Sequence, residues 1–237
     1  MKYDILLWDI DGTLMDFKRA EAKALSQSLR EVGVVPTEEL ISEYSQINIS
    51  YWKRLETGEL TKEEVLLGRF VEFLGKKKIK ADPKTFLMSY EGHLSHAWFI
   101  QDNSLELCRK LKEKGLRQYV VTNGWIDVQK TKLKESGFDK IMDGSFISDE
   151  LGVPKPKKEF FEACFERVFG SKEPSKSELA RVLIIGDSLT SDMKGGVNAG
   201  IACCWYRAKG EVNTENISVD YEIEDLWQIW NILKETV

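Results

Sequence analysis

The chain has 237 residues, of which 42% are hydrophobic and 31% are charged, and its formal net charge is −5. This length allows one large domain, or a core with a smaller inserted domain. The negative net charge gives no general attraction to nucleic acid or to an anionic membrane, so we expect neither as a partner. A small anionic substrate is still possible, because a binding site uses local charge.

The expected location of the protein is the cytoplasm. No apolar run approaches the length of a membrane span, and the first apolar run is broken by Asp4, Asp9 and Asp11. The four cysteines form no CxxC pair, which favours reduced thiols over a disulfide framework or a metal site.

Four short apolar runs predict strands, and each adjoins polar or small residues. They lie at 3–8, 118–121, 182–185 and 201–206. They are rich in Val, Ile, Leu and aromatic residues and show no alternation, which is typical of strands buried on both faces of a parallel sheet. Amphipathic patterns between them predict helices at 104–114, 128–135 and 159–169. Strands alternating with helices predict an α/β fold.

The segment from 16 to 95 has a different pattern, with no convincing strand. Its apolar spacing predicts helices at 19–32, 37–52, 62–74 and 83–93. We therefore expect an all-helical domain at 16–95, inserted as a cap over the carboxyl edge of the sheet. Residues 1–15 and 96–237 would form a Rossmann-like core.

The first chemical signal is Asp9-Ile10-Asp11-Gly12-Thr13-Leu14, directly after the first predicted strand. Two carboxylates in such an apolar context are costly unless a partner compensates them. A divalent cation is a natural partner, because Mg²⁺ prefers oxygen ligands. The alternative is an ordinary turn at the end of a strand.

The second signal is Thr122-Asn123-Gly124, also at the end of a predicted strand. A hydroxyl and successive backbone N–H groups at such a place can hold phosphate oxygens. The alternative is a simple Asn-Gly turn.

The third signal is Lys155 within Gly152-Val153-Pro154-Lys155-Pro156. A fixed ammonium group there could neutralise phosphate and carboxylate charge. The alternative is that Lys155 is one of the 34 basic residues of an ordinary surface.

The fourth signal places Asp187 after the strand at 182–185 and Asp192 five residues later. Asp187 is at a buried strand end, as Asp9 is. Asp192 could also be a helix N-terminal acid that interacts favourably with the helix dipole, and both interpretations can hold.

Together, and in this order, the four signals resemble the motifs of the haloacid dehalogenase (HAD) superfamily. The resemblance covers the whole chain, including a helical insertion of the C1 cap type after the first motif. It implies that Asp9 is a nucleophile that forms an aspartyl-phosphate and that Asp11 is the general acid/base. It further implies that Thr122 holds the phosphoryl group and that Lys155 stabilises both Asp9 and that group.

The resemblance also implies one Mg²⁺ as cofactor, bound by Asp9, the backbone carbonyl of Asp11, and Asp187. Asp192 would lie in the outer shell or position Lys155. Dehalogenases of the superfamily lack an acid/base aspartate two residues after the nucleophile, so Asp11 favours phosphate chemistry. Phosphomutases share all four motifs, so the motifs do not exclude a mutase.

The helical segment narrows the expected substrate. Residues 51–62 and 68–70 are similar to the cap of the pyrimidine 5′-nucleotidase branch, and Asn123-Gly124 suits that branch. The resemblance implies hydrolysis of pyrimidine nucleoside monophosphates (dTMP, UMP, dUMP), with Asn123, Gly124, Trp52, Arg54 and Trp125 as candidate substrate contacts. Trp52 could equally belong to the core of the helical domain. The alternatives are a sugar-phosphate phosphatase or phosphomutase and, in another class, a catalytically silent binding module.

Overall fold

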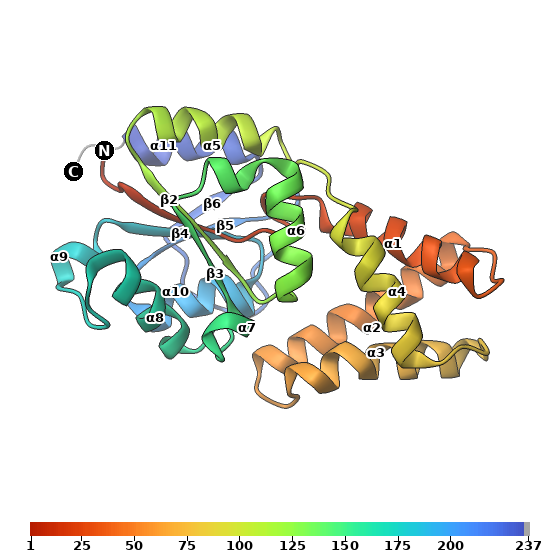
Figure 1. Ribbon diagram of the computed structural model, residues 1–237. Helices are drawn as coiled ribbons and strands as arrows, with labels where there is room; N and C mark the ends of the chain where they lie inside the picture. Colours follow the sequence, from red (N-terminus) through yellow and green to blue (C-terminus); the bar gives the residue numbers. More distant parts are fainter. Residues whose placement is uncertain (235–237) are drawn as a thin grey trace. The chain divides into compact units, whose positions relative to one another are not determined.

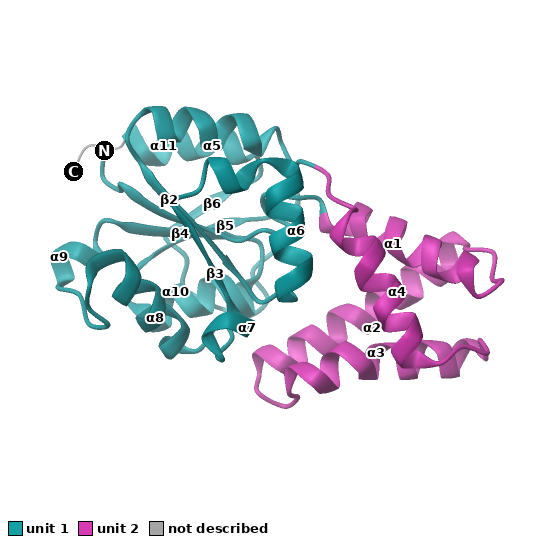
Figure 2. Ribbon diagram, viewed as in Figure 1, with its two compact units in different colours: residues 1–16, 100–237 teal, residues 17–99 magenta. Residues whose placement is uncertain are grey.

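The computed structural model describes residues 1–234. Its contacts divide the chain into two compact units (Figure 2). One unit comprises residues 1–16 together with the chain from residue 100 onward, and the other comprises residues 17–99. Each unit is described by itself.

The first unit is built on a six-stranded sheet in the order β3-β2-β1-β4-β5-β6, with every neighbouring pair parallel (Figure 1). This arrangement confirms the predicted α/β, Rossmann-like class. The strands are β1 Ile5–Trp8, β2 Arg117–Thr122, β3 Gly144–Ile147, β4 Val182–Gly186, β5 Ala202–Tyr206 and β6 Tyr221–Ile223.

Helices cover both faces of this sheet. In Figure 1, α5 and α11 lie on one face, and α8 and α10 lie on the other. Phe160, Phe161 and Phe165 of α8 pack in one buried cluster with residues of the central strands, including Ile5 and Leu7. The helices are α5 Ser104–Glu113, α6 Ile126–Ser136, α7 Ser148–Leu151, α8 Lys158–Phe169, α9 Lys176–Leu179, α10 Lys194–Ala199 and α11 Ile229–Lys234, with short turns η1 Phe138–Lys140, η2 Leu189–Met193 and η3 Leu226–Gln228.

The position of β1 places the functional motifs together. It lies in the middle of the sheet between β2 and β4. Because all three strands are parallel, their carboxyl ends meet at one edge, where the chain continues into Asp9, Asn123 and Asp187 respectively. The strand order also reverses at β1, and open α/β sheets bind their ligands at such a switch point.

The second unit is all-helical in the structure. It contains α1 Phe17–Glu31, α2 Glu38–Glu56, α3 Lys62–Lys77 and α4 Pro83–Ser95, and within the described residues 17–99 there is no strand. Thr37, Thr61 and Asp82 cap the N-termini of α2, α3 and α4 with their side chains. The role of this unit as a cap remains a prediction.

An aromatic cluster forms the core of the helical unit. The rings of Tyr44 and Phe70 stack with centroids 5.2 Å apart, and Tyr90 meets Phe70 edge-on at 5.1 Å. Such pairs contribute about 0.5–1.5 kcal/mol beyond the burial of their area. The cluster explains why the helix-spaced aromatic residues of this segment face inward.

All four cysteines are buried free thiols. Across residues 1–234, no helix combines the length and the apolar character that are needed to cross a membrane.

Candidate active site

The centre of the site is an ion-pair network around Lys155, in the loop between α7 and α8. Its ammonium donates to Asp9 Oδ1 at 2.7 Å, to Asp192 Oδ1 at 2.6 Å and to the carbonyl of Val121 at 2.7 Å. Lys155 is 1% exposed. Burial alone would lower the pKa of Lys155, but Asp192 and Asp9 together raise it above its ordinary value. The lysine is therefore a fixed, buried cation beside Asp9.

Asn123 holds the backbone of Lys155 in place. The Lys155 N–H donates to Asn123 Oδ1, and Asn123 Nδ2 donates to the Lys155 carbonyl, each at 2.9 Å. This two-way pairing joins the loop after β2 to the loop before α8. The side-chain amide of Asn123 thus has a positioning task, and its predicted contact with substrate remains a prediction.

Asp192 is held on both carboxylate oxygens. One oxygen accepts from Lys155, and the other accepts from the N–H of Ser188 at 3.2 Å. Asp192 lies in η2, a single π-helical turn, a feature that often occurs at functional sites. A side chain at Gly186 would place its Cβ 2.3 Å from Asp192 Oδ2, so only glycine fits there.

Asp187 lies against the turn that follows Asp9. Thr13 Oγ1 donates to Asp187 Oδ1 at 3.2 Å. Gly12 has a φ of +97°, and a Cβ at this residue would lie 2.4 Å from Asp187 Oδ2. Glycine therefore satisfies both the left-handed backbone and the close approach of the carboxylate. Thr13 and Gly12 together bring Asp187 beside the first motif.

The three carboxylates fit a hard divalent cation. One carboxylate oxygen each from Asp9, Asp187 and Asp192 lies within 4.8 Å of the other two. Burial raises the pKa of Asp9 well above its ordinary value, against the opposing effect of Lys155. Burial, together with Asp192, raises the pKa of Asp187 to about 7. A bound cation would offset this concentration of negative charge, and oxygen donors are those that Mg²⁺ prefers.

Thr122 ends β2 with its hydroxyl group next to a backbone amide. The N–H of Gly124 donates to Thr122 Oγ1 at 3.0 Å. With this bond made, the hydroxyl proton of Thr122 is left to donate elsewhere, as a phosphate-binding hydroxyl must. Trp125, the residue after Gly124, is half-buried at the N-terminus of α6.

The side chain of Asp11 points to α6 rather than to the other carboxylates. Lys132 Nζ donates to Asp11 Oδ1 at 2.7 Å, and Gln129 Nε2 donates to Asp11 Oδ2 at 2.5 Å. Sequence patterns did not single out either α6 residue. One sequence signal could have indicated them: Gln129 and Lys132 lie on the same side of the predicted helix as the apolar residues Val128 and Leu133, which is the side expected to be buried.

The candidate contacts in the helical unit have structural partners there. Trp52 Nε1 donates to Asn48 Oδ1 at 3.1 Å, and Arg69 Nη1 donates to the same oxygen at 2.7 Å. Arg54 pairs with Glu59 at 2.8 Å and lies over the ring of Tyr51, 5.4 Å from its centroid. A substrate role for Trp52 and Arg54 is left as a prediction.

Comparison with known proteins identifies the family of this chain independently of the site geometry. A family model for haloacid dehalogenase-like hydrolases matches residues 3–200. The HAD-family protein YfnB of Bacillus subtilis is 33% identical over 98% of this chain and 96% of its own length. Its magnesium-bound crystal structure, which reveals interdomain movement, matches with a TM-score of 0.90 over 99% of this chain and 100% of that one.

Two further relatives are pyrimidine 5′-nucleotidases. PynA of Streptococcus pneumoniae is 32% identical over 100% of this chain and 98% of its own length. YjjG of Escherichia coli is 26% identical over 98% of this chain and 99% of its own length. The matches span nearly all of both units, and the predicted membership is confirmed. The chain belongs to the haloacid dehalogenase-like hydrolase family and is an enzyme of the hydrolase class.

Proposed function

We propose that this protein is a Mg²⁺-dependent phosphatase that hydrolyses phosphate monoesters through an aspartyl-phosphate on Asp9. The observation that carries the proposal is the buried ammonium of Lys155, which lies 2.7 Å from Asp9 Oδ1 and 2.6 Å from Asp192 Oδ1. A carboxylate fixed in this way at a strand end can act as a nucleophile toward phosphorus. The positive charge can also stabilise the negative charge of the transferring group.

Asp9, Asp187 and the backbone carbonyl of Asp11 would hold Mg²⁺, with Asp192 outside the inner coordination shell. When bound, the ion would neutralise negative charge on the phosphoryl group. The cluster of three carboxylates supports this assignment, since their mutual repulsion calls for a cation. Among them, Asp192 has both oxygens engaged by Lys155 and Ser188, which supports its outer position.

The proposed reaction has two steps. In the first, Asp9 attacks phosphorus, the bond to the leaving oxygen breaks, and Asp11 gives that oxygen a proton. In the second, water attacks the phosphorus of the aspartyl-phosphate, Asp11 takes a proton from the water, and Asp9 is released as a carboxylate. Phosphoryl transfer requires mainly positioning and charge neutralisation. Lys155 and the hydroxyl of Thr122 would supply both.

We further propose pyrimidine nucleoside 5′-monophosphates, such as UMP, dUMP and dTMP, as substrates. The support is the likeness over the whole chain to PynA and YjjG, both pyrimidine 5′-nucleotidases. The core motifs read only the phosphoryl group, so other residues must read the nucleoside. Trp52, Arg54 and Trp125 are the proposed contacts, since an aromatic face can stack on a base and a guanidinium can bind its oxygens.

The test is phosphate release from dTMP, UMP, AMP and a hexose phosphate under identical Mg²⁺ concentrations. We expect the highest kcat/KM for a pyrimidine nucleotide, and no turnover in excess EDTA until Mg²⁺ is restored. An equal or higher kcat/KM for the hexose phosphate would reject the nucleotidase specificity and favour a sugar-phosphate phosphatase. Absence of turnover on every ester would leave the silent binding module as the interpretation.

A further inference from the structure

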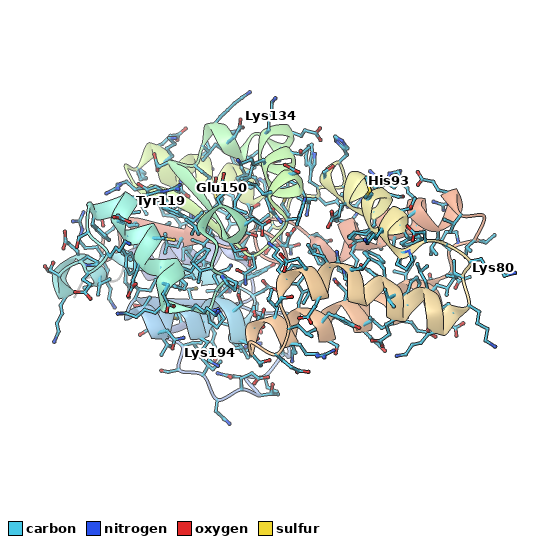
Figure 3. The ribbon with its side chains drawn as sticks, turned by 60° about the horizontal axis from the view of Figure 1, so that its bottom comes forward. Lys80, His93, Tyr119, Lys134, Glu150 and Lys194 are labelled. Atoms are coloured by element: carbon cyan, nitrogen blue, oxygen red, sulfur yellow. The ribbon has the colours of Figure 1, made fainter. Side chains whose placement is uncertain are left out.

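Helix α6 carries two polar side chains on its buried face. Gln129 and Lys132 are each 1% exposed. They are three residues apart and so lie on the same side of the helix. Lys134 on the same helix is exposed and extends away from the protein (Figure 3). A buried ammonium group is costly unless a partner compensates it, so the environment of Lys132 requires an explanation.

Both side chains end on the carboxylate of Asp11. Lys132 reaches one oxygen at 2.7 Å, and Gln129 reaches the other at 2.5 Å. The other end of the Gln129 amide, Oε1, is buried and has no hydrogen-bond partner within the described residues. A buried acceptor without a hydrogen-bond partner is unfavourable for folding, so Gln129 is better explained by its contact with Asp11 than by a contribution to stability.

The backbone beside this pair is shaped to admit it. A Cβ at Gly124 would lie 2.0 Å from Gln129 Nε2, so a side chain there would displace the glutamine. Gly124 is also the residue whose N–H binds the Thr122 hydroxyl. The loop that would hold phosphate and the contact to Asp11 are therefore linked through one glycine.

We propose that Gln129 and Lys132 are positioning residues that hold the Asp11 carboxylate in the orientation for proton transfer and away from the metal. The inference rests on the proposed function, in which Asp11 is the acid/base. A free carboxylate two residues after Asp9 would be a ready Mg²⁺ ligand, and a metal-bound carboxylate is a poor proton carrier. In the structure, the acidic cluster contains Asp9, Asp187 and Asp192 but not Asp11.

The decisive variant is Lys132→Met, which keeps the length of the side chain and removes its charge. Misplacing a reacting group by about 1 Å can reduce the rate on the order of 10²-fold. We expect kcat for dTMP to fall by about that factor, with KM nearly unchanged. Lys132→Arg should recover part of the loss. The matched control Lys134→Met, with an exposed lysine on the same helix, should behave as wild type.

Leaving-group dependence separates a positioning role from a merely structural one. The alkoxide released from dTMP needs a proton from Asp11, whereas the phenolate released from p-nitrophenyl phosphate needs it much less. Lys132→Met should therefore lower kcat/KM for dTMP more than for the aryl ester. Gln129→Met should show the same preference with a smaller loss, and it serves as a second variant if Lys132→Met does not fold.

A double-mutant cycle completes the test. If Lys132 acts through Asp11, then Lys132→Met should not lower the residual aryl-phosphatase activity of Asp11→Asn any further. Wild-type kcat in folded Lys132→Met would overturn the proposal, as would equal losses on both esters that add to those of Asp11→Asn. An inactive wild-type enzyme would instead contradict the proposed function.

Discussion

Replacing Lys155 with methionine removes the positive charge from the centre of the acidic cluster and keeps a side chain of similar length. The side chain of Lys155 is 2% exposed, and those of Asp9 and Asp192 are 10% and 1% exposed. Water therefore has little access to replace the lost ammonium. The substitution leaves Asp9 and Asp192 without their cationic partner, close to Asp187.

The expected loss in the free energy of unfolding is about 3–5 kcal/mol, the typical result of removing one partner from a buried ion pair. The three hydrogen bonds of Lys155, which are 2.6 to 2.7 Å long, would by themselves suggest a larger loss in the free energy of unfolding. The folded protein, however, already bears the cost of burying the ammonium, and this cost disappears with the lysine. The net loss in the free energy of unfolding is therefore dominated by the missing positive charge beside Asp9 and Asp192.

The assay is urea denaturation in EDTA at pH 7, with Lys194→Met as the control. Lys194 is exposed (Figure 3), and its replacement should change stability by less than about 0.5 kcal/mol. The loss in Lys155→Met should shrink at lower pH, where the carboxylates accept protons. A loss below about 1 kcal/mol at pH 7, with an unchanged fold, would contradict the conclusion that Lys155 compensates the charge of Asp9 and Asp192.

Two further predictions concern the metal site and the helical unit. The pKa of Asp187 is raised from 3.8 to about 7, so the folded state holds a proton there that the unfolded chain releases. In EDTA, wild type should therefore lose stability relative to Asp187→Asn as the pH rises from about 4 to about 7, and a relative gain in urea denaturation would contradict this sign. In Gly68→Ala, the new Cβ would lie 2.6 Å from Tyr51 Cε1, whereas Gly75→Ala in the same helix meets nothing within 4 Å. Because Arg54 lies over the ring of Tyr51, displacing Tyr51 should disturb the proposed contact of Arg54 with the nucleoside. Gly68→Ala should therefore lower kcat/KM for UMP on the order of tenfold and leave aryl phosphate turnover unchanged. Equal kcat/KM for UMP in Gly68→Ala and Gly75→Ala would contradict a substrate role for residues 51–70.

Sequence patterns predicted the central strands well and the edge strands poorly. The runs that predicted β1, β2, β4 and β5 are apolar because those strands are covered on both faces. β3 and β6 lie at the two edges of the sheet, with four and three residues respectively, and both include residues that are not buried. Short, partly exposed strands leave no continuous apolar run to detect.

The site likewise contains residues that sequence patterns predicted and contacts that they did not. Asp9, Lys155, Asp187 and Asp192 were predicted from motifs, and the structure brings them together although Asp9 and Lys155 are 146 residues apart. The two-way pairing of Asn123 with the Lys155 backbone could not be predicted, because it depends on the path of two loops.

The contacts of Gln129 and Lys132 with Asp11 were also missed. Polar residues on an amphipathic helix are normally exposed, and the pattern alone does not tell which of them reach inward. Only the packing of α6 beside the end of β1 reveals their partner.

The role of Asp9 as the nucleophile is tested most directly by turnover of dTMP by Asp9→Asn in saturating Mg²⁺, measured beside wild type. The amide is a very poor nucleophile toward phosphorus, and it can still accept a hydrogen bond from Lys155. We expect a folded protein whose kcat is reduced on the order of 10³-fold or more. Near wild-type turnover, in a sample whose mass shows no deamidation back to aspartate, would contradict the assignment of Asp9 as the nucleophile.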